Sequence, residues 1–196
     1  ELNSITDKIH KNRVEAIPVL TSKLSEILSQ LGMPNAQFRI ELIATEDFKS
    51  NGKEDIQFLF SANKGSDFGS LKKVASGGEM SRIMLAIKYI LSQYSNLPTI
   101  IFDEIDTGVS GEIAHKMGEI MKQMSTKMQV FAITHLPQIA GKGKEHFKVF
   151  KVIENNQTQS ELKLLSDNER INEIAQMLSG SVISESAINH AKELLN

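Results

Sequence analysis

Several kinds of residue and segment are absent from this sequence, and each absence narrows the classes of protein to which it can belong. The 196 residues include no cysteine, which excludes disulfide bridges and thiolate metal centres and is compatible with a reducing cytosol. No apolar run is long enough to span a membrane, and the first residues are unlike a secretory signal peptide. We therefore expect no membrane association.

An excess of basic charge is also absent. The chain has 22 lysine and arginine residues against 24 aspartate and glutamate residues, which gives a net charge of −2. A domain that binds DNA on its own is usually basic. The composition therefore argues against a standalone DNA-binding domain, an alternative that salt-dependent DNA binding by this chain alone would revive.

The phosphate-binding P-loop sequence G-x-x-x-x-G-K-[S/T] is missing as well. Residues 141–144 alternate glycine and lysine, but they have neither the required spacing nor a hydroxyl residue after the lysine. The chain begins without methionine, inside a segment that is predicted to be helical. We interpret it as a piece of a longer protein.

The apolar pattern predicts a mixed α/β protein. Residues 1–31 have heptad-like apolar spacing, typical either of an amphipathic helix packed on its own domain or of the end of a coiled coil, and Pro18 should kink or restart this helix. The order strand, helix, strand through residues 99–133 predicts parallel pairing with flanking helices. The further predicted elements are strands at 37–44 and 55–62, an amphipathic helix after residue 76, a hairpin at 147–153 and 160–165, and helices at 169–178 and 184–195.

Ser76, Gly77, Gly78 and Glu79 stand at the start of the amphipathic helix. A serine followed three residues later by a glutamate is the pattern of a capping box. The two glycines leave backbone N–H groups accessible, and the N-terminus of a helix attracts phosphate. Taken alone, these four residues are also compatible with an ordinary capped helix.

Acidic residues and a histidine follow the two short apolar strands. Asp103 and Glu104 come directly after residues 99–102, and His135 comes soon after residues 130–133. Ligands of open parallel sheets bind at the carboxyl ends of the strands. An acid there can hold Mg²⁺ while its neighbour deprotonates an attacking water. In isolation, the pair is equally compatible with solvated turn acids, and the histidine with an ordinary surface residue.

Together these signals carry a specific resemblance. Residues 71–82 resemble the ABC signature motif, residues 99–111 the Walker B motif and D-loop, and residues 134–140 the switch region of the RecN family of bacterial DNA-repair ATPases. Residues 31–36 and 60–65 also match that family. The resemblance spans nearly the whole chain and corresponds to the C-terminal part of RecN, which is an SMC-like ABC ATPase.

The resemblance implies a fold and a division of the chain. The implied fold is α/β, the C-terminal lobe of an ABC-type ATPase head, with a mostly parallel sheet and flanking helices. Residues 1–31 would be a helix that leads from a coiled coil, and residues 32–196 would form the lobe. The P-loop, or Walker A motif, would lie on an N-terminal lobe of the same protein.

Such heads hold two ATP molecules between two copies, so the resemblance also implies contacts across that interface. Ser76, Gly77 and Gly78, with Glu79, would clasp the γ-phosphate of ATP held by the opposing head. Asp106 would lie in the contact between the two heads and couple their two sites.

The resemblance implies catalytic roles for three residues. Asp103 would assist Mg²⁺ binding through water, and Glu104 would be the general base that polarises the attacking water. His135 would contact the γ-phosphate and respond to its loss. The expected cofactors are therefore ATP and Mg²⁺.

The implied function is ATP hydrolysis in DNA double-strand break repair and recombination. The expected partners are the Walker A lobe, a second head and, through the full-length protein, DNA, in the bacterial cytoplasm at the nucleoid. The chain alone is expected to bind ATP weakly and to be inactive. The alternatives are a lobe of another SMC-like chromosome-organising ATPase, or a non-catalytic dimerisation module.

Overall fold

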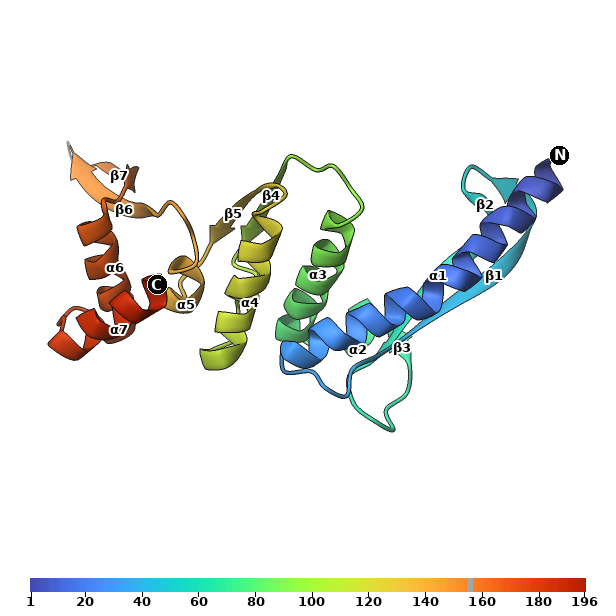
Figure 1. The fold of residues 1–196 in the computed structure, drawn as a ribbon, viewed down its shortest axis with the longest axis horizontal. Coiled ribbons are helices and arrows are strands. Elements are labelled where there is room, and N and C mark those ends of the chain that lie inside the picture. Colours follow the sequence, from blue (N-terminus) through green and yellow to red (C-terminus); the bar gives the residue numbers. More distant parts are fainter. Residues whose placement is uncertain (155–156) are drawn as a thin grey trace. The chain divides into compact units, whose positions relative to one another are not determined.

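A computed structural model describes residues 1–154 and 157–196 of the chain. These residues form two compact units, Glu1–Ser95 and Asn96–Asn196 (Figure 1). Helices and small sheets occur in both units, which confirms the predicted α/β class. The expected boundary after residue 31 stays a prediction. Among the described residues, no helix combines the length and the apolar character that crossing a membrane requires.

The first unit is built on a long β-hairpin with a helix beside it (Figure 1). Strands β1 and β2 pair antiparallel, and β3 extends the sheet beyond β2. The two long strands extend past the predicted runs, because pairing resumes at Lys49 and Gly52 after a register shift. The elements of this unit are α1 (Leu2–Gln30), β1 (Gln37–Lys49), β2 (Gly52–Ser61), β3 (Gly69–Ser70), α2 (Leu71–Val74) and α3 (Gly77–Ser92).

Helix α1 is continuous through Pro18, so the predicted restart at this residue is wrong. A proline inside a helix removes its own N–H donor and crowds the carbonyl four residues earlier, but the hydrogen bonds on either side can continue. The hydroxyl of Thr21 donates to the carbonyls of Ile17, at 3.0 Å, and Pro18, at 3.2 Å.

The two ends of α1 have different surroundings. Helix α1 contacts β1, β2 and α3, and its C-terminal part buries Leu24, Ile27 and Leu28. Its N-terminal part lies beside the turn of the hairpin, where Arg13 donates to the Asn51 carbonyl at 2.6 Å. Its N-terminal part exposes apolar side chains, at Leu2, Ile5, Val14 and Val19. Both interpretations of this segment thus apply in part, because the C-terminal turns pack on their own unit and the N-terminal turns fit the end of a coiled coil.

The second unit contains the strands whose ends carry the candidate catalytic residues. Strands β4 and β5 pair in parallel, as the strand, helix, strand order predicted. In the described part of the chain, parallel pairing is confined to these two strands. The other paired strands follow one another along the chain and pair antiparallel, because a short connection suits an antiparallel pair. The elements are β4 (Thr99–Asp103), α4 (Gly111–Met124), β5 (Gln129–Ile133), α5 (Pro137–Ala140), β6 (Phe147–Glu154), β7 (Gln157–Leu164), α6 (Asp167–Ser179) and α7 (Glu185–Leu195).

The second unit has its core beside helices α4, α6 and α7. Helix α4 contacts β5 and buries most of one face, at Ala114, Met117, Gly118, Ile120, Met121 and Met124. Helices α6 and α7 pack together around a buried cluster of Ile174, Ala175, Ala187 and Ala191. The hairpin and the two terminal helices predicted from the sequence are therefore confirmed.

Candidate active site

The signature segment opens helix α3 as a complete capping box. Ser76 is the N-cap residue, and its hydroxyl oxygen accepts from the backbone N–H of Glu79 at 3.4 Å. The Glu79 carboxylate in turn accepts from the Ser76 backbone N–H at 2.8 Å and from its hydroxyl at 2.9 Å. The predicted capping box is confirmed, and Glu79 holds the start of the helix in place.

Gly77, directly after Ser76, leaves space above the backbone. A β-carbon added at Gly77 would meet nothing within 4 Å, so a ligand can approach the backbone there. The first backbone N–H groups of a helix have no partner inside the helix and carry its positive dipole end. The geometry of Ser76, Gly77 and Gly78 is therefore suited to a phosphate group.

Arg82 is a residue of this segment that the sequence analysis missed. Its guanidinium donates to the carbonyl of Gly78 at 3.1 Å and to that of Leu31 at 2.9 Å. It therefore links the signature glycines to the residue that ends α1. Its spacing of four residues from Gly78, which places both on one face of the helix, was the available signal.

The carboxyl ends of β4 and β5 bring the acidic pair and the histidine to one edge. Asp103 lies opposite Ile133, and the backbone N–H of Glu104 donates to the Ile133 carbonyl at 3.0 Å. Asp103, Glu104 and His135 are all exposed, so a ligand can reach them. The signature residues lie in the other compact unit and are described separately.

Glu104 has a backbone φ of 47°, and no other non-glycine residue in the described chain has a positive φ. The left-handed region costs an L-residue about 1–2 kcal/mol relative to its ordinary conformations. Three hydrogen bonds hold the Glu104 backbone in this conformation. Its N–H donates to the Ile133 carbonyl, and its own carbonyl accepts from the N–H of Thr107 at 3.2 Å and from the Thr107 hydroxyl at 2.8 Å. Residues with a backbone conformation of this kind are common at active sites.

Asp106 is buried, with 1% of its side chain exposed. One carboxylate oxygen, Oδ2, accepts from the hydroxyl of Thr134 and lies 3.8 Å from Nδ1 of His135. The other, Oδ1, has no hydrogen-bond partner among the described residues, which costs about 1–3 kcal/mol for a buried acceptor. The Asp106 carboxylate thus faces inward, and its expected place in a contact between heads stays a prediction.

Thr134 is a second residue that the sequence analysis missed. Its position between an apolar strand and His135 was the available signal. Its hydroxyl oxygen also accepts from the backbone N–H of Leu136 at 3.0 Å. Ser110 occupies the N-cap position of α4, but its side chain makes no capping hydrogen bond.

The carboxylates at the strand ends fit Mg²⁺ only together with other ligands. The described residues contain no cluster of three side chains that could hold a metal ion. Protein-bound Mg²⁺ commonly keeps several waters and uses one or two carboxylates plus the phosphates of the substrate. The exposed carboxylate of Asp103 suits that limited role.

One face of the β4–β5 pair is apolar and open. Ile101, Phe131 and Ile133 are 64%, 43% and 54% exposed, and they share this face with Asp103. Parallel strands are normally covered on both faces. In the described residues neither strand has a neighbour along its outer edge. This sheet is therefore incomplete by the usual rules of α/β proteins.

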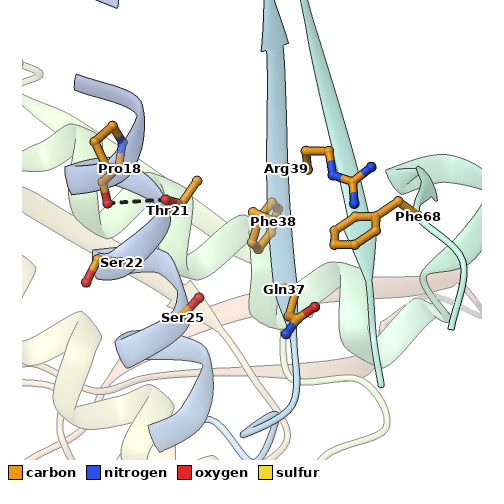
Figure 2. Close-up of a pocket in the computed structure, with 8 residues that line it drawn as sticks. All are labelled: Pro18, Thr21, Ser22, Ser25, Gln37, Phe38, Arg39 and Phe68. Atoms are coloured by element: carbon orange, nitrogen blue, oxygen red, sulfur yellow. Dashed lines mark hydrogen bonds between the residues drawn. The ribbon is translucent and has the colours of Figure 1, made fainter. Parts of the chain in front are cut away.

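A separate shallow cavity of about 400 Å³ lies beside α1 and β1 in the first unit (Figure 2). The guanidinium of Arg39 lies over the ring of Phe68, 4.0 Å from its centre. None of the candidate phosphate or catalytic residues lines it, so it is distinct from the candidate site. Its lining residues are Pro18, Thr21, Ser22, Ser25, Gln37, Phe38, Arg39 and Phe68.

The class of protein follows from this fold. A crystal structure of the Smc head domain with a coiled coil and joint, from Pyrococcus yayanosii, matches 90% of this chain and 32% of its own length with a TM-score of 0.66 and 18% sequence identity. The fold of this chain is thus similar to that of part of an SMC head domain. No protein-family model matches the sequence.

Curated relatives give a more specific likeness. The DNA repair protein RecN of Rickettsia felis is 44% identical over 184 residues, which cover 94% of this chain and 34% of that protein. The DNA repair protein RecN of Deinococcus radiodurans is 42% identical over 181 residues, with 92% and 31% covered. This is a RecN-like chain. It spans about a third of the length of these relatives and corresponds to their C-terminal part.

Proposed function

We propose that this chain is the signature and Walker B lobe of an ATPase head that hydrolyses ATP during DNA double-strand break repair and recombination. The observation that carries the proposal is the strained backbone of Glu104, held beside Asp103 and His135 at the ends of two parallel strands. The likeness of the chain to RecN proteins supports the link to DNA repair. The bacterial cytoplasm, at the nucleoid, is the place where such a protein would act.

The catalytic roles follow from the chemistry of phosphoryl transfer, which needs positioning and charge neutralisation more than covalent participation. Glu104 is exposed at the strand end, where its carboxylate can orient and deprotonate a water. Asp103 would hold Mg²⁺ through water, and the ion would neutralise charge on the phosphates. The exposed imidazole of His135 can donate a hydrogen bond to a phosphate oxygen.

The signature segment would serve a second active site. The open backbone at Gly77 and the capping box of Ser76 and Glu79 present N–H groups to a phosphate. In this proposal that phosphate is the γ-phosphate of ATP bound to a second head. Hydrolysis would remove the bridging phosphate and let the two heads separate.

The active site would be completed by a lobe with the P-loop. The apolar face formed by Ile101, Phe131 and Ile133, next to Asp103, is open, and the strands have free edges in the described chain. The chain spans only about a third of its relatives, so there is protein to cover this face. We propose that the lobe with the P-loop covers it and brings the phosphates of ATP to Asp103 and Glu104.

The test compares this chain with the complete RecN-like protein that contains the P-loop. We expect ATP hydrolysis only in the complete protein, with kcat lowered about a hundredfold or more by Glu104→Gln while ATP still binds, as for the loss of a general base. Glu112→Gln, at an exposed acid in the first turn of α4, is the matched control. Hydrolysis by the 196-residue chain that Glu104→Gln abolishes would refute the split site, and an unchanged kcat in the complete Glu104→Gln protein would refute the base.

A further inference from the structure

The burial of Asp106 sets it apart from the other acids at the strand ends. Asp103 and Glu104 are exposed, whereas the side chain of Asp106 is 1% exposed. A buried carboxylate is unfavourable unless it is paired or hydrogen-bonded. Its bond from the hydroxyl of Thr134 joins two residues that are 28 positions apart. An ordinary turn acid would face the solvent, so the position of Asp106 calls for a specific role.

The bond between Asp106 and Thr134 connects two turns that carry different functional side chains. Asp106 belongs to the turn after β4, which begins with Glu104, and the Thr107 N–H bonds back to the Glu104 carbonyl at 3.2 Å. Thr134 directly precedes His135 after β5. The same hydroxyl oxygen accepts from the N–H of Leu136 at 3.0 Å, so it also shapes the turn that holds the histidine.

A second link runs through the backbone. The N–H of Glu104 donates to the carbonyl of Ile133 at 3.0 Å, one residue before Thr134. By contrast, Oδ2 of Asp106 and Nδ1 of His135 are 3.8 Å apart, which is too long for a hydrogen bond. Asp106 therefore reaches the histidine mainly through Thr134.

We propose that Asp106 is a positioning residue that, through Thr134, makes the turn of Glu104 and the turn of His135 move as one unit. The inference rests on the proposed function and deepens it. When His135 shifts on binding or losing a phosphate, the Thr134 hydroxyl pulls on Asp106 and so on the turn that aims Glu104. The general base is then correctly placed only when the histidine turn is in its phosphate-bound position.

The first test uses ATP hydrolysis by the complete RecN-like protein with substitutions at Thr134. Valine keeps the branched shape and removes the hydroxyl, whereas serine keeps the hydroxyl. We expect Thr134→Val to lower kcat about tenfold to a hundredfold, as misplacement of a catalytic group does, with the KM for ATP within about twofold. We expect Thr134→Ser to retain most of the activity. Equal kcat in the valine variant and the wild type, or equal loss in both variants, would overturn the proposal.

A second measurement does not need ATPase activity. Hydrogen–deuterium exchange of the same proteins follows the backbone of residues 103–110, with residues 111–124 of α4 as the internal control. We expect Thr134→Val, but not Thr134→Ser, to exchange faster than the wild type at residues 103–110, and we expect no change in α4 in either variant. Unchanged exchange at 103–110, or faster exchange in both segments, would reject the link between the turns. An inactive wild type with this exchange pattern would reject the ATPase function and leave the link standing.

Discussion

The left-handed backbone of Glu104 can be tested by a pair of substitutions that differ only in a β-carbon. In Glu104→Ala the β-carbon remains, and with it the clash that disfavours a φ of 47°. In Glu104→Gly the clash disappears. The hydrogen bonds that Ile133 and Thr107 make with residue 104 involve its backbone only, so both variants keep them.

The expected difference in unfolding free energy follows from two opposing effects. Relief of the left-handed conformation favours glycine by about 1–2 kcal/mol. The greater freedom of glycine in the unfolded chain offsets about 0.5–1 kcal/mol of this. We therefore expect the glycine variant to be more stable than the alanine variant by about 0–1.5 kcal/mol, with a centre of about 0.75 kcal/mol, or roughly 3–6 °C in the melting temperature of a unit of this size.

Calorimetry of the 196-residue chain measures this difference. Tyr89 and Tyr94 are the two tyrosines of the chain, and both lie in the first unit, so tyrosine fluorescence follows that unit and should not change. Asp103 has no positive φ, and there the alanine variant should be the more stable of the pair. A glycine variant at 104 that is less stable than the alanine variant would refute the strained backbone.

Two further predictions concern stability. A β-carbon at Gly141 would lie 2.9 Å from the carbonyl oxygen of Leu194, so Gly141→Ala should lower the free energy of unfolding by about 1–3 kcal/mol. The control Gly77→Ala should change it by about 0.5 kcal/mol or less, because a β-carbon there meets nothing within 4 Å. Chemical denaturation measures both variants, and equal effects would contradict the close packing around Gly141. The hydrogen bond from the ammonium of Lys163 lowers the pKa of Glu169 from 4.5 to about 2. Its ionised form therefore favours the folded state above pH 4.5, and this contribution is lost as the pH falls from 4.5 towards 2. Unfolding by urea across this pH range should depend less on pH in Glu169→Gln, and an unchanged slope would show that the Glu169 carboxylate does not contribute.

Local sequence patterns predicted the parts of the site that local interactions form. The capping box needs only Ser76 and Glu79 at a spacing of three, and the structure contains it. The parallel pairing of β4 and β5 followed from the order strand, helix, strand. The prediction at Pro18 was too strict, because the loss of one donor did not interrupt a helix whose C-terminal turns pack on a sheet.

The roles of Asp106 and Thr134 could not be read from local patterns. The two residues are 28 positions apart and meet because the parallel register of β4 and β5 brings the following turns together. A sequence pattern shows that an acid follows a strand, but burial depends on which elements pack around it. The contact between heads that the resemblance suggested for Asp106 stays a prediction, and only the structure shows that its carboxylate accepts a hydrogen bond from Thr134.

By itself, the sequence determined the likeness to RecN, the approximate positions of the longer helices and strands, and the identity of the candidate phosphate and catalytic residues. These depend on residue type and on spacings within a few positions. Only the tertiary structure decided that Glu104 has a left-handed backbone, that Asp106 is buried against Thr134, and that Arg82 joins the signature helix to the end of α1. These features depend on contacts between segments that are distant along the chain, and such contacts exist only once the chain has folded.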